Sequence, residues 1–446
     1  MEKNDEKEIS GFSKLNKRDK IYWLAKNFLY ANPVDIFKEF AEYWHDNVEA
    51  QKLLDGFSEN TLTNFPVPFG IAPNFKINER MYAVPMVIEE SSVVAAASNA
   101  AKYWLSRGGF KAEVLSTKKV GQVHFIYQGD KEKLFSFFTN TKLEIKNGVK
   151  HITAKMEERG GGVLDMELLD FSSQEPDYFQ LRAYFETVDS MGANFINSCL
   201  EEFGKLLVEK VEASHLFTET EKDIEIVMCI LSNYTPECIV RAEVGCTIEE
   251  LGTFDGGKIS AEEFARKFER AVNIACIDPY RATTHNKGIM NGIDAVVLAT
   301  GNDFRAVEAC AHTYASRDGV YRSLSSCKVE NGFFRFWLDF PIAIGTVGGL
   351  TSLHPLAKRS LELLGNPNAK QLMEIIACVG LAQNFAAVRS LTTSGIQAGH
   401  MKMHLTNILA SFKANDDEVT KAKQYFADKT VSVAAVRDYL EGLRKG

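Results

Sequence analysis

The sequence NKGIMNGIDAVVLATGND occupies residues 286–303 and carries a lysine, an apolar run and an aspartate in close succession. Lys287 stands beside a glycine before the apolar run at residues 293–299, and Asp303 follows that run. Apolar runs of this length between turn signals are typical of buried strands, so the pattern predicts a strand over residues 293–299. The strand would place Lys287 near one end and Asp303 near the other. A buried lysine beside a carboxylate can stabilise an oxyanion and pass a proton.

Lys287 and Asp303 also have a simpler interpretation. A lysine near a glycine turn is usually a solvated surface residue, and an aspartate after a strand is usually a helix cap. Because short motifs carry little weight by themselves, both interpretations stay open on these residues alone.

The composition is typical of a large globular protein. The chain has 446 residues, of which 45% are hydrophobic, enough for roughly two or three domains. The formal net charge of -8 disfavours a nucleic-acid partner. The first eight residues are too polar for a signal peptide, and no apolar segment is expected to reach the roughly 20 residues that span a bilayer. We therefore expect a soluble, cytoplasmic protein with no membrane partner.

The cysteines favour the same compartment. They stand singly and form no CxxC pair, so neither a zinc ribbon nor a thioredoxin motif is expected. Several lie in apolar runs, as reduced thiols of cytosolic proteins do. The eight are Cys199, Cys229, Cys238, Cys246, Cys276, Cys310, Cys327 and Cys378.

The pattern of elements predicts an α+β fold with an inserted domain. Between residues 110 and 228, strand-like runs flank two helical stretches, as in a split βαβ unit. This range would be a small domain inserted into a large mixed helix and sheet domain, residues 1–109 and 229–394. The strand candidates are residues 111–115, 122–127, 164–169, 179–185, 224–231, 238–244, 295–299 and 333–340, and the helix candidates are 18–29, 91–106, 130–139, 191–211, 261–275, 304–315, 356–364 and 369–391.

The C-terminal residues 395–446 form a third part of the chain. This segment is more polar and contains two short helical patterns, at residues 416–426 and 431–443. A charged helical tail of this kind is either a mobile lid or a docked surface hairpin, and the sequence does not separate the two.

An acidic pair, Glu89 and Glu90, precedes the alanine-rich helix predicted from residue 91. Acids before a helix N-terminus commonly stabilise the helix dipole. Alternatively, two adjacent acids beside an apolar helix can raise the pKa of one of them and keep it protonated. Ser91 is expected to cap this helix.

Two glycine-containing segments suit a nucleotide. Residues 189–194 read DSMGAN and open a helix, whose N-terminus can receive a phosphate. Residues 345–351 read GTVGGLT, a turn whose backbone can approach a ligand closely. The GxGxxG fingerprint is absent, so a nicotinamide cofactor would occupy a non-Rossmann site.

His400 lies near the start of the C-terminal segment. Histidine can protonate a leaving group because its pKa lies near neutrality. His400 and His404 have a spacing of four residues that also suits a metal, but no third ligand accompanies them, so no metal is expected. His285, His312 and His354 are expected to be hydrogen-bonded structural groups.

Taken in order, these segments resemble the class II, soluble microbial type of 3-hydroxy-3-methylglutaryl-CoA (HMG-CoA) reductase. Each string is weak alone, whereas the ordered set covers nearly the whole chain and is specific. The matching strings are residues 85–98 (PMVIEESSVVAAAS), 189–194 (DSMGAN), 230–233 (ILSN), 278–292 (DPYRATTHNKGIMNG), 300–303 (TGND), 345–349 (GTVGG) and 395–401 (GIQAGHM).

The resemblance implies a role for each matching residue. Glu90 would donate a proton, Lys287 would stabilise the oxyanion on the thioester carbonyl, and Asp303 would contact both. His400 would protonate the departing CoA thiolate. Arg281 would bind the free carboxylate of the substrate, for which a guanidinium fork is well shaped. The other substrate-binding residues would be Asn233, Asp189, Ser92 and Asn291, and those binding the dinucleotide would be Asp189, Met191, Gly192, Ala193, Asn194, Gly348 and Gly349.

The resemblance also implies the reaction and the assembly. HMG-CoA would be reduced by four electrons to mevalonate and CoA, through a hemithioacetal and mevaldehyde, for isoprenoid biosynthesis. The insert would be a ferredoxin-like dinucleotide-binding domain, the C-terminal segment a flap carrying His400, and the enzyme an obligate homodimer. Assembly into a hexamer, oxidative use in mevalonate degradation, and a catalytically inactive CoA- or nucleotide-binding homologue stay open.

The choice between NADPH and NADH is suggested by residues 149–156. This segment contains Lys150, His151 and Lys155 and no acid. An acid would favour a free ribose hydroxyl, whereas a cation accepts a 2′-phosphate. The segment therefore favours NADPH.

Overall fold

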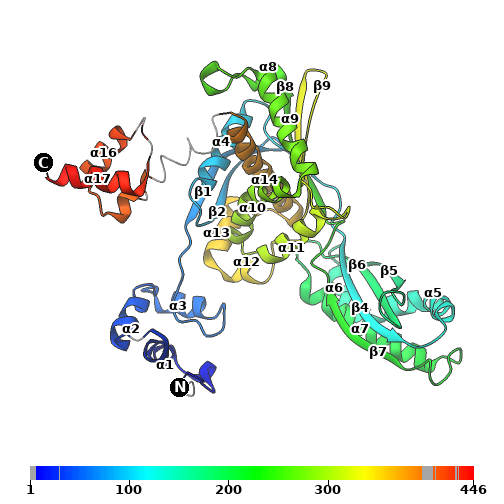
Figure 1. Cartoon of the computed structure of the whole chain (residues 1–446). Helices are drawn as coiled ribbons and strands as arrows, with labels where there is room; N and C mark the ends of the chain where they lie inside the picture. Colours follow the sequence, from blue (N-terminus) through cyan, green and yellow to red (C-terminus); the bar gives the residue numbers. More distant parts are fainter. Residues whose placement is uncertain are drawn as a thin grey trace. The chain divides into compact units, whose positions relative to one another are not determined.

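The computed structural model of the chain describes residues 7–29, 31–393, 405–406, 408–426, 429 and 431–445. Two compact units are present, Met1–Pro68 and Phe69–Gly446 (Figure 1). The predicted residues His400 and His404 lie outside the described part of the chain.

The first unit is a small group of helices held by aromatic side chains. Its helices are α1 (Lys17–Leu24), α2 (Pro33–Ala41) and α3 (Val48–Asp55), with a 3-10 turn η2 (Phe12–Lys14) and a π-helical turn η3 (Ala25–Leu29). Each α-helix begins after an asparagine whose side chain accepts a backbone N–H, at Asn16, Asn32 and Asn47, as is preferred at helix N-termini. The helix predicted over residues 18–29 is confirmed as α1 and η3.

The second unit begins with a hairpin that the sequence analysis did not predict. Strands β1 (Phe69–Ile77) and β2 (Arg80–Val87) pair antiparallel across the two-residue turn Asn78-Glu79. Both turn residues have positive φ, 47° and 65°, as two-residue turns of type I′ require. Helix α4 (Val93–Leu105) follows and packs against β1.

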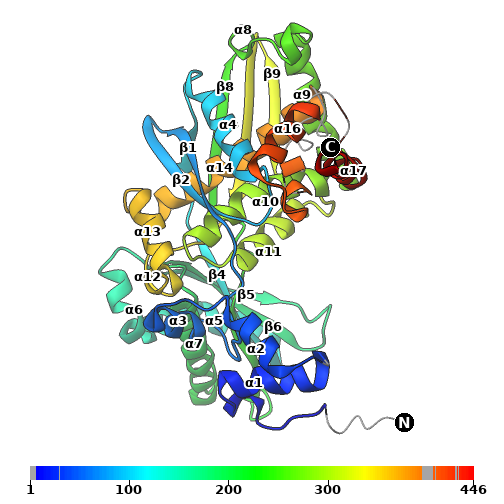
Figure 2. The same ribbon diagram turned by 90° about the vertical axis from the view of Figure 1, so that its left-hand side faces the viewer.

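A four-stranded antiparallel sheet forms the centre of this unit. Its order is β3 (Lys111–Val114), β8 (Ile239–Thr247), β10 (Phe333–Pro341) and β9 (Ser325–Glu330). Alternate residues of β10, from Phe334 to Phe340, are buried, as expected when one face of a sheet covers the core. Helix α14 (Ala369–Thr392) contacts β3, β8 and α4, and Figure 2 shows α4 and α14 beside this sheet.

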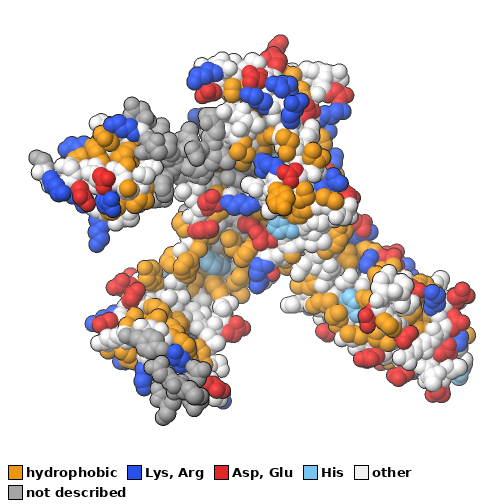
Figure 3. Space-filling model, viewed as in Figure 1, with side chains coloured by type: hydrophobic (Ala, Val, Ile, Leu, Met, Phe, Trp, Pro, Cys, Tyr) orange, Lys and Arg blue, Asp and Glu red, His pale blue; other side chains and the backbone are white. Residues whose placement is uncertain are grey.

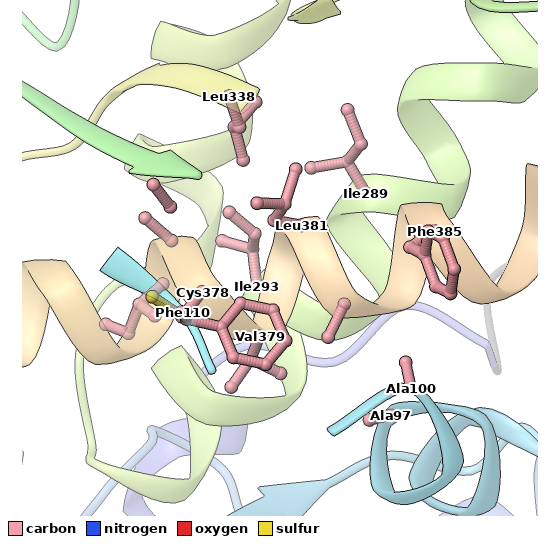
Figure 4. Close-up of a cluster of buried hydrophobic side chains, with 14 of the residues drawn as sticks. Ala97, Ala100, Phe110, Ile289, Ile293, Leu338, Cys378, Val379, Leu381 and Phe385 are labelled. Atoms are coloured by element: carbon pink, nitrogen blue, oxygen red, sulfur yellow. The ribbon is translucent and has the colours of Figure 1, made fainter. Parts of the chain in front are cut away.

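The described central part contains six further helices, of which α9 and α10 contact α14. The six are α8 (Ile248–Leu251), α9 (Ala261–Ile277), α10 (Pro279–Ala299), α11 (Phe304–Ala315), α12 (Leu350–Leu353) and α13 (Pro355–Leu363). In Figure 4, Cys378, Leu381 and Phe385 of α14 meet Ile289 and Ile293 of α10 and the alanines of α4. The predicted helix over residues 304–315 is confirmed with those bounds.

The strand predicted over residues 293–299 is wrong, because this segment is the end of helix α10. The helix begins after Asp278, whose side chain caps it, with Pro279 in the first turn. The glycines serve close helix packing: a Cβ on Gly292 would lie 2.8 Å from the carbonyl oxygen of Val379, and one on Gly380 would lie 2.7 Å from Ile293. A helix buried on most sides shows no amphipathic pattern, so its apolar run resembles a buried strand.

Helix α14 corrects the expectation that no segment is long and apolar enough to span a bilayer. Its 24 residues meet that criterion by length and composition, but 83% of the apolar window is buried inside the structure. It is the central helix of the hydrophobic core, and core helices commonly have this composition.

A second four-stranded antiparallel sheet has its own core. Its order is β5 (Gly162–Asp170), β6 (Tyr178–Glu186), β4 (Lys119–Tyr127) and β7 (Ile224–Leu231). Helices α5 (Lys131–Gly148) and α6 (Lys150–Glu157) connect β4 to β5, and α7 (Ala193–Ala213) connects β6 to β7. Helix α7 buries Ile196, Leu200, Phe203 and Leu207 in this core, at the spacing of one helix face.

Two strands lie at the predicted domain boundaries, residues 110 and 228. The boundary at residue 110 fell before β3, which pairs with β8 of the first sheet. The boundary at residue 228 cuts β7, which pairs with β4 of the second sheet. The alternation of apolar residues reveals a strand but not its partner, so the sequence alone does not assign β3 and β7 to a sheet. A mixed fold of helices and antiparallel sheets is present, as predicted.

The described C-terminal residues form a small hydrophobic cluster of their own. Helices α16 (Asp416–Tyr425) and α17 (Val433–Lys445) confirm the two predicted patterns. Leu409, Ala422 and Val436 are fully buried in this cluster. Arg444 pairs with Glu418 at 2.6 Å.

Candidate active site

One face of helix α10 carries three of the predicted site residues. Arg281, Lys287 and Asn291 are separated by six and four positions, which at about 100° per residue places them within an arc of about 120°. Other faces of α10 are buried, including Ile289 and Ile293. A strand would also place these residues on one face, but it would spread them about twice as far apart, so the helix accounts for their closeness.

Lys287 forms an ion pair with Glu90. Its Nζ donates to Oε2 of Glu90 at 2.8 Å, and the side chains are 59% and 40% exposed. Glu90 lies in the loop between β2 and α4, and β2 packs against α10. The fold thus brings together two predicted residues from distant parts of the sequence and leaves both open to a ligand.

The chain is strained beside Glu90. Ser92 occupies the N-cap position of α4 with a left-handed φ of 79°, and its side chain makes no capping hydrogen bond. The expectation that Ser91 caps this helix is therefore wrong. A non-glycine residue in this region is uncommon and typical of functional sites.

Asp303 caps helix α11 and pairs with Arg305. Its Oδ1 accepts backbone N–H bonds from Arg305 at 3.0 Å and Ala306 at 3.3 Å, and its carboxylate accepts two bonds from the Arg305 guanidinium. Burial opposes ionisation, but these hydrogen bonds outweigh it, so the pKa of Asp303 is lowered. Within the described structure its hydrogen bonds go to α11, and none joins it to Glu90 or Lys287.

The two glycine-containing segments lie side by side. The carbonyl oxygen of Asp189 accepts the Thr346 N–H at 2.8 Å, and a Cβ on Gly345 would lie 2.6 Å from the Met191 nitrogen. The Asp189 side chain accepts the N–H of Ala369, the first residue of α14, at 2.9 Å. The structure therefore brings residues 189–194 and 345–349 together across the junction of the two sheets.

This junction has space and donors for an anionic group. Gly192 precedes the 21-residue helix α7 with φ of 90°, and no side chain caps the helix. The first backbone N–H groups of such a helix can bind a phosphate. Gly348 and Gly349 have φ of 81° and 56°, and a Cβ on either would face open space. These features fit the pyrophosphate of a dinucleotide.

A small cavity lies at the same junction. Met191 and Asn233, predicted respectively to bind dinucleotide and substrate, both line it. Lys119, which the sequence analysis did not select, lines it too. A lysine beside a second lysine at the start of a strand resembles a solvated residue, so no sequence signal separated it from its neighbour Lys118.

His285 is a buried structural group, as predicted. Its Nε2 contacts the Ser325 hydroxyl at 2.7 Å, and that hydroxyl donates to Asn384 of α14 at 2.7 Å. Burial and, to a lesser extent, the positive charge of Arg281 lower the pKa of His285 to about 3. A neutral imidazole here ties α10 to α14 and so fixes the helix that carries Lys287.

The comparisons with known proteins agree with this arrangement. Residues 34–405 match the family model described as hydroxymethylglutaryl-coenzyme A reductase. The chain belongs to the hydroxymethylglutaryl-coenzyme A reductase family. A match to a solved class II enzyme indicates the class II form.

Relatives align over nearly the full length. The 3-hydroxy-3-methylglutaryl-coenzyme A reductase of Archaeoglobus fulgidus is 34% identical over 445 residues, 98% of this chain and 94% of that one. A Streptococcus pneumoniae reductase structure is also 34% identical, with a TM-score of 0.71 over 98% of this chain and 100% of that one. A class II S. pneumoniae structure bound to NADPH in open conformations is 34% identical, with a TM-score of 0.70 over 86% of this chain and 100% of that one.

Proposed function

We propose that this protein reduces HMG-CoA to mevalonate and CoA, consuming two NADPH and two protons, in the direction of isoprenoid biosynthesis. The observation that carries the proposal is the Glu90–Lys287 pair at 2.8 Å. Lys287 lies on the face of α10 that also presents Arg281 and Asn291. A cation and a carboxyl group in contact and accessible to ligand suit the reduction of a carbonyl group, which needs both charge stabilisation and a proton.

Lys287 and Glu90 divide these two tasks. The Lys287 ammonium stabilises the oxyanion that forms when the thioester carbonyl accepts hydride, and again when the aldehyde is reduced. Such electrostatic stabilisation is usually the largest catalytic contribution. Glu90 supplies the proton to the oxygen beside Lys287, with which it is within hydrogen-bonding distance. Its carboxylate first takes up that proton from solvent, to which the side chain is 40% exposed.

Asp303 and His400 complete the proposed chemistry. Asp303 tunes the Glu90–Lys287 pair when its carboxylate turns from Arg305, an exposed partner, towards the ligand. His400 protonates the CoA thiolate after the carbon–sulfur bond of the hemithioacetal breaks, which releases the aldehyde. The C-terminal segment carrying His400 acts as a flap, so that the cofactor can exchange between the two reductions.

Substrate binding is proposed for five further residues. The Arg281 guanidinium pairs with the free carboxylate of the acyl group, since two parallel N–H bonds match a carboxylate. Asn291 lies near Arg281 on α10, and Asn233 lines the junction cavity. Ser92 and Asp189 complete this set.

The dinucleotide is proposed to bind at the junction of the two sheets and to supply hydride. Residues 191–194, at the start of α7, would hold its pyrophosphate together with Asp189 and the open backbone of Gly348 and Gly349. NADPH is favoured because Lys150, His151 and Lys155 are exposed on α6, where cations can receive a 2′-phosphate.

The domain organisation follows from the two sheets. The order β5-β6-β4-β7, with helices after the first and third strands along the chain, supports a ferredoxin-like dinucleotide domain over about residues 117–232. Residues 69–116 and 233–393, which hold the other sheet and its helices, would form the HMG-CoA domain.

A homodimer in the cytoplasm is proposed for the assembly. Ile277, at the end of α9, and Tyr280, at the start of α10, are 75% and 89% exposed. Figure 3 shows apolar side chains gathered over the middle of one face. Large exposed apolar surfaces commonly bind a partner. All eight cysteines are free, which supports a reducing compartment.

The stoichiometry of cofactor oxidation tests the function. Purified protein would be mixed with limiting HMG-CoA and either NADPH or NADH, and the near-ultraviolet absorbance of the reduced cofactor followed. Oxidation of about two cofactors per HMG-CoA is expected for a four-electron reduction, faster with NADPH. No oxidation by well-folded protein would contradict the proposal.

A further inference from the structure

Lys119 is a buried cation at the junction of the two sheets. It is the first residue of β4 and only 4% exposed. Burial lowers its pKa, and among the described residues no carboxylate forms an ion pair with it. The two carboxylates whose charges act on it, Glu186 and Asp189, bond elsewhere. Glu186 accepts from Thr117 and the Val188 N–H, and Asp189 accepts from the Ala369 N–H.

The Lys119 ammonium has one donor to spare. A lysine has three N–H donors. One donates to the Thr187 hydroxyl and a second to the Ser190 carbonyl oxygen, at 2.9 Å. The described residues offer no acceptor to the third. A buried donor without an acceptor is unfavourable, especially on a charged group.

The cavity beside Lys119 has room for one small group. Its volume is about 20 Å³, room for about one water-sized group. Met191 and Asn233 line the same cavity, so a ligand atom there would lie between the segments proposed for dinucleotide and substrate. The rest of the lining is largely apolar, which strengthens a hydrogen bond formed inside it.

We propose that Lys119 is a ligand-positioning residue whose third N–H donates to an oxygen atom of the ligand bound at this cavity. This inference rests on the proposed function. The oxygen comes either from the acyl group of the substrate or from the carboxamide of the nicotinamide, since both are acceptors of suitable size. Its contacts with Thr187 and Ser190 hold the ammonium in place and order the turn that leads into Met191.

The test compares Lys119→Met with Lys118→Met. Methionine keeps much of the apolar stem and removes the charge and the donors. Lys118 is the matched control because it carries the same charge one position earlier, is 30% exposed and pairs with Glu237 at the surface. For the full-length proteins, the Kd for NADPH and the Kd for HMG-CoA would be measured separately by calorimetry, along with Tm and turnover.

We expect Lys119→Met to weaken one of the two ligands at least tenfold while its Tm stays near that of Lys118→Met. Selective loss of HMG-CoA affinity assigns the oxygen to the acyl group, and selective loss of NADPH affinity assigns it to the carboxamide. Unchanged affinities would overturn the inference, as would equal weakening of both ligands with a lowered Tm. Wild-type protein that binds both ligands without turnover would contradict the proposed function alone.

A second variant decides the matter if Lys119→Met does not fold. Ala343 also lines the cavity, so Ala343→Val reduces its volume and leaves both protein hydrogen bonds of Lys119 in place. The same selective loss of affinity is expected. Wild-type affinity for both ligands in Ala343→Val would overturn the inference.

Discussion

Lys287 donates a hydrogen bond to Glu90 at 2.8 Å across 197 residues of sequence. An exposed ion pair contributes only about 0–1 kcal/mol to stability, and these side chains are 59% and 40% exposed. The fold therefore gains little from this contact. Its value lies in holding a cation and a carboxyl group together where a ligand can reach both.

The packing of α10 against α14 makes a prediction for Gly292. A Cβ there would lie 2.8 Å from the Val379 carbonyl oxygen and 2.9 Å from the Gln383 Cβ, so Gly292→Ala forces the helices apart. We expect a loss of about 1–3 kcal/mol in the free energy of unfolding, measured by urea denaturation. Gly288→Ala is the control, because its Cβ would meet only Ala387 at 3.7 Å. Equal stability of the two variants would contradict this packing.

The buried Asp294 of α10 should make the free energy of unfolding depend on pH. Burial, and then the neighbouring Glu308, raise its pKa to about 8, against about 3.9 when unfolded. Between these values the native state binds more protons than the unfolded state, so stability falls as pH rises through this window and levels off above about pH 8. We expect Asp294→Asn to remove this part of the decline in denaturation measurements across the range. Asp318→Asn, a substitution of an exposed residue, should retain the full decline in stability. If Asp294→Asn declines as much as the wild type, Asp294 is not the cause of the decline.

The ion pair with Arg305 should affect the pKa of Asp303 and so the pH dependence of the reaction. The Arg305 guanidinium helps to lower the pKa of Asp303, so Arg305→Ala should raise it. If Asp303 acts as a carboxylate, the acid limb of the kcat/KM profile then moves to higher pH, because Asp303 is protonated sooner. Arg317→Ala, just beyond the C-terminal end of α11, should leave the profile unchanged. An unmoved limb in Arg305→Ala would show that ionisation of Asp303 does not limit the reaction.

The sequence was sufficient for elements whose ends carry clear signals. The helix over residues 304–315 has an aspartate cap, and its bounds were predicted correctly. Helix α10 also has a cap and a proline, at Asp278 and Pro279, but its buried faces removed the periodic pattern and its last turns were predicted as a strand. The sequence could not show to which sheet a strand belongs. The strands β3 and β7 have similar patterns of residues and differ only in the strands with which they pair.

Site residues that belong to a motif could be predicted. Roles that depend on tertiary contacts could not. The motifs selected Glu90 and Lys287, and the fold places them in contact. They did not reveal that Asp303 bonds to Arg305, nor that Lys119 is buried while Lys118 is not, because neither fact is local in sequence.

The most direct test of the catalytic pair is the turnover of Lys287→Met, compared with Lys267→Met. Lys267 is the matched control because it forms a similarly exposed pair with Glu263, at 2.6 Å, on α9. HMG-CoA affinity and the rate of NADPH oxidation would be measured for both. We predict that Lys287→Met binds HMG-CoA like the control but has a kcat about 10²–10³ times lower, the usual cost of losing oxyanion stabilisation. An unchanged kcat in Lys287→Met would contradict the assignment of Lys287 and the mechanism built on it.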